Sequence, residues 1–306
     1  MRMFTRILIF VLALFSMGCG STPTSTPAPA PKVFDGARAF NHVNEQMKLG
    51  SRPTGSAANR ALTEYLIKQL KESKWNVVTQ DFEYQGVPIR NVIGKIAEGR
   101  GPIIIVGAHF DTRPWADEDP VDKRKPVLGA NDGASGVAVM LELARVLDAA
   151  KLKNEVWLAF FDAEDNGNLP TCALGVTPCN NLIWPFSIGA EYVAANMPAA
   201  PEMVVILDMI GDANQDIYFE GFSDMPTQEI LWGIAAKLGY EKNFIPQVKW
   251  SMDDDHTPFL KRGYRAVDMI DFDYPYWHTI QDTTDKVSAT SLERVGRVMH
   301  TWLETK

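Results

Sequence analysis

The sequence predicts an α/β protein with a single globular domain, in which helices flank a central mixed, largely parallel β-sheet. Three observations lead to this fold class. Short apolar runs alternate along the chain with segments that repeat apolar residues at helical spacing. Of the 306 residues, 46% are hydrophobic, which is enough for a sizeable core. Beyond residue 34 the sequence has no repeat and no linker that would separate a second domain.

The first 18 residues (1–18) have the pattern of an export signal peptide. Arg2 and Arg6 precede an apolar run over residues 7–15, which is too short to span a bilayer. The small residue and Cys19 that follow resemble a bacterial lipoprotein signal, in which lipid attached to Cys19 anchors the protein to a membrane. We therefore expect an extracytoplasmic lipoprotein, with ordinary secretion as the alternative.

The residues that follow agree with export. Residues 19–33 are rich in Pro, Ser and Thr and should form a semi-extended tether ahead of a folded domain at 34–306. Cys172 and Cys179 lie close together in the sequence of that domain. In an oxidising compartment they could form a local disulfide or remain two free thiols.

The domain should begin with two helices and then three strands. Asp35 is placed to cap the first helix, and the segment 50–55, which contains Gly and Pro, ends it. Ser56 opens the second helix, whose apolar residues fall on one face. The third strand is apolar enough to be central in a sheet. The strands are expected at residues 75–82, 89–96 and 103–107.

A long loop over residues 109–131 comes next, and long loops in compact domains are often functional. A helix over 133–147 follows it, and the apolar run 156–159 should form a buried strand. Residues 166–185 should be irregular. The remaining elements are strands at 203–207 and 266–270 and helices at 187–196, 227–238 and 291–303.

Three carboxylates, those of Asp162, Glu164 and Asp165, crowd the end of the strand expected at 156–159. In an open α/β sheet, ligands bind at the carboxyl ends of the strands. Like charges this close repel one another unless a cation or a shared proton relieves them. We therefore predict a zinc site around Glu164 and Asp165, in which one residue binds the metal and the other carries protons.

Other residues of metal-binding types also lie just past apolar runs. A catalytic zinc ion usually takes three protein N or O ligands and keeps one position open. Asp132, which lies among glycines, could bind metal or cap the following helix. The acidic run 253–256, taken alone, is typical of a turn or an exposed face. The candidate ligands of this kind are His109, Asp111, Asp132, Asp208 and His278.

Six short segments carry most of these residues in order along the chain. They are GAHFDT at 107–112, GANDGASG at 129–136, FFDAED at 160–165, LDMIG at 207–211, DDHTPFL at 254–260 and WHT at 277–279. Their composition and order resemble the zinc exopeptidase superfamily, which contains two-zinc aminopeptidases and one-zinc glutaminyl cyclases. The resemblance covers the chain from about residue 34 onward.

The resemblance implies a role for each matching residue. Glu164 would act as general acid and base. In the aminopeptidase branch, His109 and Asp208 would hold a second zinc ion, with Asp132 bridging both metals. All of these ligand types are present, so they do not choose between the branches. The zinc ligands common to both branches would be Asp132, Asp165 and His278.

Other details resemble the cyclase branch. Asp254 in the DDH segment and Trp277 before the ligand histidine look like glutaminyl cyclases, and the insertion 113–117 is similar to bacterial members. Two positions depart from the animal enzymes. Asp165 stands where the animal enzymes carry Glu, and Asp268 stands where they carry a His of their hydrogen-bond network. The detailed proton relay of the animal enzymes is therefore not expected to carry over to this chain unchanged.

We therefore predict that 34–306 is a zinc-dependent catalytic domain, a glutaminyl-peptide cyclotransferase that converts the N-terminal Gln of peptides or proteins to pyroglutamate and releases ammonia. One Zn²⁺ is expected. Asp254 and Asp268 would share a proton, Asp208 would accept a hydrogen bond from the substrate amine, and Trp277 would wall the pocket.

Two alternatives stay open. One is a zinc aminopeptidase with two Zn²⁺ ions, and the other is a catalytically silent binding module on the same fold. A nucleic-acid partner is excluded, because the formal charge is −8 and the sequence has no basic stripe. Contact with a membrane is expected only through the lipid anchor on Cys19.

Overall fold

The computed structural model describes residues 32–175 and 181–306, which belong to one compact unit. The predicted signal peptide, the lipidated Cys19, nearly all of the tether and Cys179 lie outside the described residues and stay predictions. Within the described part, no helix is both long and apolar enough to cross a membrane.

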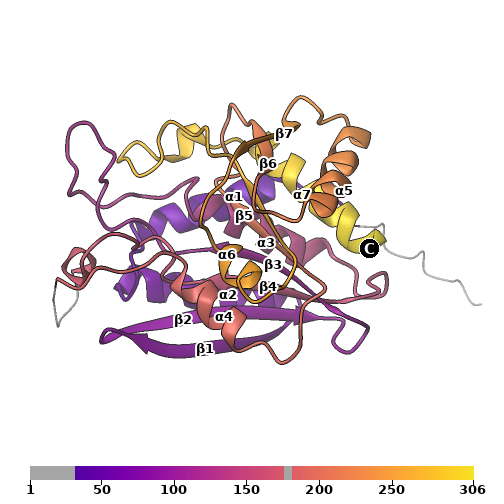
Figure 1. The fold of residues 1–306 in the computed structure, drawn as a ribbon, viewed down its shortest axis with the longest axis horizontal. Helices are drawn as coiled ribbons and strands as arrows, with labels where there is room; N and C mark the ends of the chain where they lie inside the picture. Colours follow the sequence, from indigo (N-terminus) through magenta and orange to yellow (C-terminus); the bar gives the residue numbers. More distant parts are fainter. Residues whose placement is uncertain (1–31, 176–180) are drawn as a thin grey trace, which may run out of the picture. The chain divides into compact units, whose positions relative to one another are not determined.

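A six-stranded sheet forms the centre of the domain (Figure 1). Its strands lie in the order β1-β2-β4-β3-β5-β8. The four strands β4, β3, β5 and β8 run parallel, whereas β2 runs antiparallel to both of its neighbours. The predicted mixed, largely parallel sheet is therefore confirmed. The bounds are β1 Asn76–Tyr84, β2 Val87–Ile96, β3 Ile103–His109, β4 Glu155–Phe161, β5 Met203–Asp208 and β8 Ala266–Ile270.

Helices cover both faces of this sheet. Alternate residues of β3 show the division, since Ile104 and Val106 pack with the helices α1, α3 and α7, and Ile105 packs with α4 on the other face. Both faces are apolar, as expected for central parallel strands. The helices are α1 Gly36–Leu49, α2 Ala57–Glu72, α3 Ala134–Val146, α4 Ile188–Ala195, α5 Met225–Lys237, α6 Thr257–Leu260 and α7 Ala289–Thr305.

Local capping explains where the first helices begin. The Asp35 carboxylate accepts hydrogen bonds from the first turn of α1, and the Ser56 hydroxyl accepts one from the Asn59 N–H of α2. Both caps agree with the sequence. Helix α3 begins differently, because its N-cap is Gly133, which has φ 94° and no side chain to bond. Asp132 therefore does not cap α3, and its carboxylate can take part in the candidate metal site.

Three parts of the fold differ from the prediction. A second sheet of two parallel strands, β6 Ile217–Glu220 and β7 Phe244–Trp250, was not expected. Strand β7 is largely exposed, and Pro, Gln and Lys interrupt its apolar residues, so it lacks the apolar run that marks a buried strand. The single turn of α6 was also not expected, and residues 166–185, expected to be irregular, contain a short 3₁₀ helix, Thr171–Leu174. Cys172 is disulfide-bonded, which is one of the two states that the sequence left open.

The order of the strands determines where a ligand can bind. The chain goes from β3 to its neighbour β4 and then crosses to β5 on the opposite side of β3. The connections leave the carboxyl ends of β4, β3 and β5 in different directions, which opens a crevice at that edge. The predicted site residues lie at this edge.

Candidate metal and catalytic site

The predicted ligands come from five different segments that meet at the carboxyl edge of the sheet. His109 ends β3, Asp208 ends β5, and Asp165 lies just after β4. Asp132 precedes α3, and His278 lies in the loop that follows β8. All are buried except Asp208, whose side chain keeps 12% exposure.

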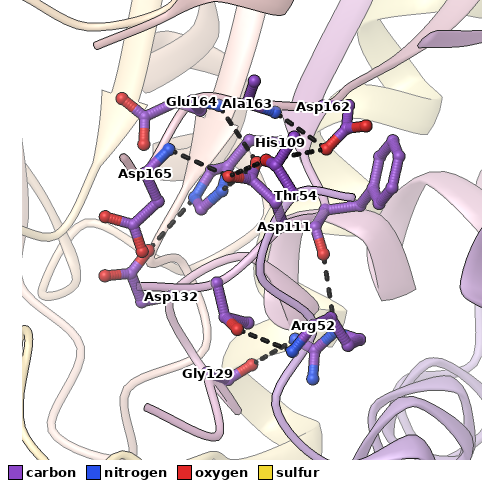
Figure 2. Close-up of polar contacts among 12 residues, drawn as sticks. Arg52, Thr54, His109, Asp111, Gly129, Asp132, Asp162, Ala163, Glu164 and Asp165 are labelled. Carbon is purple, nitrogen blue, oxygen red and sulfur yellow. Dashed lines mark hydrogen bonds and ion pairs between the residues drawn. The ribbon is translucent and has the colours of Figure 1, made fainter. Parts of the chain in front are cut away.

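These residues form two groups that share Asp132. Its Oδ1 lies 3.1 Å from Nε2 of His109, which is in turn 3.3 Å from Oδ1 of Asp208. Its Oδ2 faces Nε2 of His278 at 3.9 Å, and that nitrogen lies 3.0 Å from Oδ1 of Asp165. In each group the ligand atoms lie within 4.8 Å of one another. Figure 2 shows the first contact, between His109 and Asp132.

The electrostatics of the group Asp132, Asp165 and His278 fit a cation. Oδ2 of Asp132 and both carboxylate oxygens of Asp165 are buried without a hydrogen-bond donor. Burial and repulsion by Asp132 raise the pKa of Asp165. Burial alone would lower the pKa of His278, but Asp165 and Asp117 raise it to about 9. Buried carboxylates of this kind need a positive partner, and imidazole with carboxylate is a donor set of zinc.

The backbone is strained where it presents these side chains. Ala163, Met209 and His278 have φ of 61°, 45° and 53°, in the left-handed region that favours glycine. Ala163 precedes Glu164, Met209 follows Asp208, and His278 is itself a candidate ligand. Strain of about 1–3 kcal/mol for each such residue is typical of functional sites held by their surroundings.

Asp111 holds the backbone of the acidic pair and belongs to neither ligand group. Its Oδ1 accepts the N–H of Glu164 at 3.0 Å, and its Oδ2 accepts the N–H of Asp165 at 3.1 Å (Figure 2). Asp162, at the start of the same turn, accepts hydrogen bonds from Thr54 and Asn59. These two carboxylates fix the turn that presents Glu164 and Asp165.

Asp282, which was not among the predicted residues, has the same role for Asp132. Its two oxygens accept the backbone N–H groups of Asn131 and Asp132 at 2.9 and 3.0 Å, and Oδ1 also accepts the hydroxyl of Tyr274 at 2.7 Å. No signal in the sequence distinguishes Asp282, because an Asp among Thr and Gln residues is common in turns.

The insertion 113–117 reaches into the site. The buried guanidinium of Arg113 donates to both carboxylate oxygens of Asp117 and to the carbonyl oxygen of Asp165. Asp117 in turn faces His278, with 3.3 Å between Oδ1 and Nδ1. The insertion therefore connects two candidate ligands, which the sequence did not show.

A third acidic group surrounds the predicted proton carrier. Glu164, Asp254 and Asp255 bring carboxylate oxygens within 4.8 Å of one another. Burial, together with the charges of Asp254 and Asp165, raises the pKa of Glu164 well above its ordinary value, although His109 opposes this. Both carboxylate oxygens of Asp268 are buried without a hydrogen-bond partner, and burial together with the charge of Asp254 raises the pKa of Asp268 well above its ordinary value. The structure thus places Glu164 and Asp254 in one acidic group, with Asp268 close enough to feel the charge of Asp254.

The acidic run 253–256 is therefore not the exposed turn that it suggests when taken alone. Asp254, Asp255 and His256 are buried, and only Asp253 faces solvent. His256 lies between Glu220, with 3.2 Å from Nε2 to Oε2, and Asp268, with 3.8 Å from Nδ1 to Oδ2. Tertiary packing overrides the local pattern here, and neither Glu220 nor His256 was predicted as part of the site.

The indole ring of Trp277 packs against the candidate ligand His278. Its ring stacks on His278 with centroids 3.8 Å apart and 24° between the planes. Phe272 meets the other side of Trp277 edge-on at 5.3 Å. Trp277 therefore lies against a candidate ligand, and its role as a wall of the substrate pocket stays a prediction.

Buried imidazole and carboxylate side chains that meet at the carboxyl edge of an α/β sheet are typical of the metal site of a zinc-dependent enzyme. Residues 91–303 match peptidase family M28, and the chain belongs to this family. The resemblance to the zinc exopeptidases is thereby confirmed.

Known proteins from both branches are similar to this chain. A glutaminyl cyclase of Bacteroides thetaiotaomicron, solved with N-acetylhistamine, has a TM-score of 0.82 and 29% identity over 90% of this chain and 99% of its own. A Zn-dependent exopeptidase of Parabacteroides distasonis has a TM-score of 0.80 and 29% identity over 90% and 100%. The glutaminyl-peptide cyclotransferase of Boiga dendrophila is 23% identical and covers 82% of this chain and 76% of its own length.

Proposed function

We propose that this protein is a glutaminyl-peptide cyclotransferase that converts an N-terminal Gln to pyroglutamate and releases ammonia. The observation that carries the proposal is the acidic group of Glu164 and Asp254, with Asp268 nearby, beside the group Asp132, Asp165 and His278. The similarity to bacterial and animal cyclases supports it.

The reaction needs one group that first accepts and then donates a proton. The α-amine nitrogen of the substrate bonds to the side-chain carbonyl carbon of Gln, and the bond from that carbon to the amide nitrogen breaks. One proton moves from the amine to the departing nitrogen, which leaves as ammonia. Glu164 is placed to move it, because burial and neighbouring carboxylates make its carboxylate hold protons more tightly than an exposed Glu.

The other residues would bind and orient the substrate. Asp208, beside the site, would accept a hydrogen bond from the α-amine, and Trp277 would limit the pocket to a small side chain. Asp132, Asp165 and His278 would hold Zn²⁺, which when bound supplies a Lewis acid for the amide carbonyl. Asp254 and Asp268 would share a proton and so support the change of protonation at Glu164.

The test gives the zinc-loaded protein matched peptides that begin with Gln or with Leu. The proposal expects ammonia and a pyroglutamyl peptide from the first and no free Leu from the second. Release of free Leu without pyroglutamate would overturn it.

A zinc aminopeptidase is the second candidate, because the group His109, Asp132 and Asp208 is complete. With a second ion there, Glu164 would take a proton from water that attacks the first peptide bond. Metal content separates the two proposals. About one zinc per chain favours the cyclase, and close to two favours the aminopeptidase.

We also propose that residues 34–306 act outside the cytoplasm, tethered through lipid on Cys19. The leader and the Pro-, Ser- and Thr-rich segment support this proposal. Mass spectrometry of the mature N-terminus tests it, since an acylated Cys19 supports the anchor and an unmodified N-terminus indicates ordinary secretion.

A further inference from the structure

Residues 50–55 connect α1 to α2 and lie far in sequence from every candidate ligand. The sequence predicts only that this segment ends the first helix. Two of its side chains, those of Arg52 and Thr54, are nonetheless fully buried. Figure 2 shows both of them next to the loop and the turn that carry the site. Burial of a charged and a polar side chain here needs a reason beyond the end of a helix.

The guanidinium of Arg52 holds the loop that leads to Asp132. Nη1 donates to the carbonyl oxygen of Leu128 at 2.8 Å, and Nη2 donates to that of Gly129 at 2.9 Å (Figure 2). Gly129 suits this contact, because its φ of 66° favours glycine and a Cβ atom there would lie only 3.2 Å from Nη2. The start of the Asp132 loop is therefore bonded to Arg52.

The same side chain contacts the segment of another candidate ligand, His109. Nε of Arg52 donates to the carbonyl oxygen of Phe110, the residue after His109, at 3.4 Å. Nη1 also donates to the Gly50 carbonyl at 3.0 Å, within its own segment. A planar guanidinium presents its donors in a fixed fork, so these bonds set the distance between the two ligand segments.

Arg52 also brings a buried positive charge to the site. All four of these acceptors are uncharged carbonyl oxygens, so the hydrogen-bond partners do not neutralise the charge. Burial lowers the pKa of Arg52 to about 10, although the charges of Asp282, Asp111 and Asp132 oppose this. The side chain therefore stays charged at neutral pH. Its attraction for these three carboxylates offsets part of their mutual repulsion.

Thr54 connects the segment to the turn of Glu164 and Asp165. Its hydroxyl lies 3.0 Å from Oδ1 of Asp162 and 3.3 Å from Oδ2 of Asp111, and it can donate to either carboxylate. Asp162 and Asp111 are the carboxylates that fix this turn. The segment thus reaches the acidic turn as well as the two ligand segments above.

We propose that Arg52 is a positioning residue of the candidate metal site, which holds the loop of Asp132 against the end of β3 and keeps the zinc ligands in place before the ion binds. The inference rests on the zinc site of the proposed function. It does not depend on cyclisation, because Asp132 would be a ligand in both the cyclase and the aminopeptidase.

Two effects of Arg52 on zinc binding have opposite signs, and substitution separates them. The positive charge of Arg52 repels a cation, so its loss alone would tighten zinc binding. The hydrogen bonds of Arg52 hold the ligand segments, so their loss would weaken zinc binding. Arg52→Met removes the charge and the bonds, whereas Arg52→Lys keeps the charge but not the planar fork.

Competition with a chelator measures the zinc affinity of the folded wild type and of both variants. We expect each variant to bind zinc about tenfold more weakly than wild type, as is typical when a residue that supports metal ligands is lost. Lys should not rescue binding, because one ammonium group cannot replace a fork that contacts both segments. The zinc-dependent gain in melting temperature should shrink in parallel.

Two control variants separate positioning from a general loss of stability or charge. Trp75→Phe removes a buried hydrogen bond of 2.9 Å from Nε1 to the carbonyl of Ala144, near the end of α3 that is far from Asp132. It should lower the melting temperature of metal-free and zinc-loaded protein alike and keep the zinc affinity. Arg60→Met removes an exposed positive charge of α2 and should also keep the zinc affinity.

A zinc affinity of Arg52→Met that equals or exceeds that of wild type would overturn the proposal, and so would wild-type affinity in Arg52→Lys. If Arg52→Met does not fold, Arg52→Lys alone carries the test. Failure of the cyclase assignment would be visible separately. Wild type would then form no pyroglutamate from a Gln-initiated peptide, while the zinc affinities would still report on Arg52.

Discussion

The carboxylate of Asp117 faces the imidazole of His278, with 3.3 Å between Oδ1 and Nδ1. The other ring nitrogen, Nε2, is thereby directed at Asp165 and Asp132. Arg113 holds Asp117 from behind through two hydrogen bonds. A carboxylate on the far nitrogen of a ligand histidine sets its orientation and raises its basicity, so the insertion should tune metal binding.

We expect Asp117→Ala to weaken zinc binding by about 10- to 100-fold, because the imidazole loses the group that orients it. Competition with a chelator measures the affinity. Asp122→Ala, an exposed carboxylate of the same loop, is the control and should leave the affinity unchanged. Equal affinities for Asp117→Ala and the control would show that Asp117 does not support His278.

Asp282 should contribute to stability and to the position of Asp132. In Asp282→Ala the buried N–H groups of Asn131 and Asp132 and the hydroxyl of Tyr274 lose their acceptor. Buried donors without partners cost about 1–3 kcal/mol each, so we expect the free energy of unfolding to fall by several kcal/mol. Urea unfolding of the metal-free protein measures it.

Tyr274→Phe removes only one of these hydrogen bonds and leaves Asp282 in place. It should cost about 1 kcal/mol. If both variants lose the same small amount, Asp282 does not hold the Asp132 loop.

Asp271, which is not one of the candidate ligands, should make the stability of the protein depend on pH. Burial raises the pKa of Asp271 to about 7, although its carboxylate accepts the Asp216 N–H. The folded protein holds the proton of Asp271 more tightly than the unfolded chain does. The protonated carboxyl therefore stabilises the fold fully below the unfolded pKa of about 4, and this stabilisation is lost as pH rises through 7.

Asp271→Asn keeps an acceptor for Asp216 and cannot ionise. The variant should therefore gain stability relative to wild type between pH 5 and pH 8, by about 2–4 kcal/mol. Urea unfolding of both metal-free proteins at the two pH values tests this. A difference between variant and wild type that does not change with pH would contradict the raised pKa.

Local chemistry explains which parts of the fold were predictable. The caps Asp35 and Ser56 and the apolar strands depend on neighbours in sequence, and they form where the sequence places them. The carboxylates that support the site act across long separations, since the bond from Asp132 to Asp282 spans 150 residues. No local pattern distinguishes such residues from ordinary turn residues.

The acidic run that ends at His256 also shows that a local pattern does not determine burial. Its composition is typical of an exposed turn, and only the packing around β8 and Glu220 buries three of its four residues. The candidate metal ligands were predictable because six segments together resemble a known superfamily. Their distances and the sharing of Asp132 required the structure.

The proposed cyclisation depends most on Glu164 as the group that moves the proton. The most direct test measures pyroglutamate and ammonia formed from a Gln-initiated peptide by zinc-loaded wild type and Glu164→Gln. We predict that wild type forms both products and that the variant loses about 10²- to 10⁴-fold in rate while it keeps its zinc and its fold. Wild-type rates in the variant, or free Gln as the product of either protein, would contradict the proposed role of Glu164 in cyclisation.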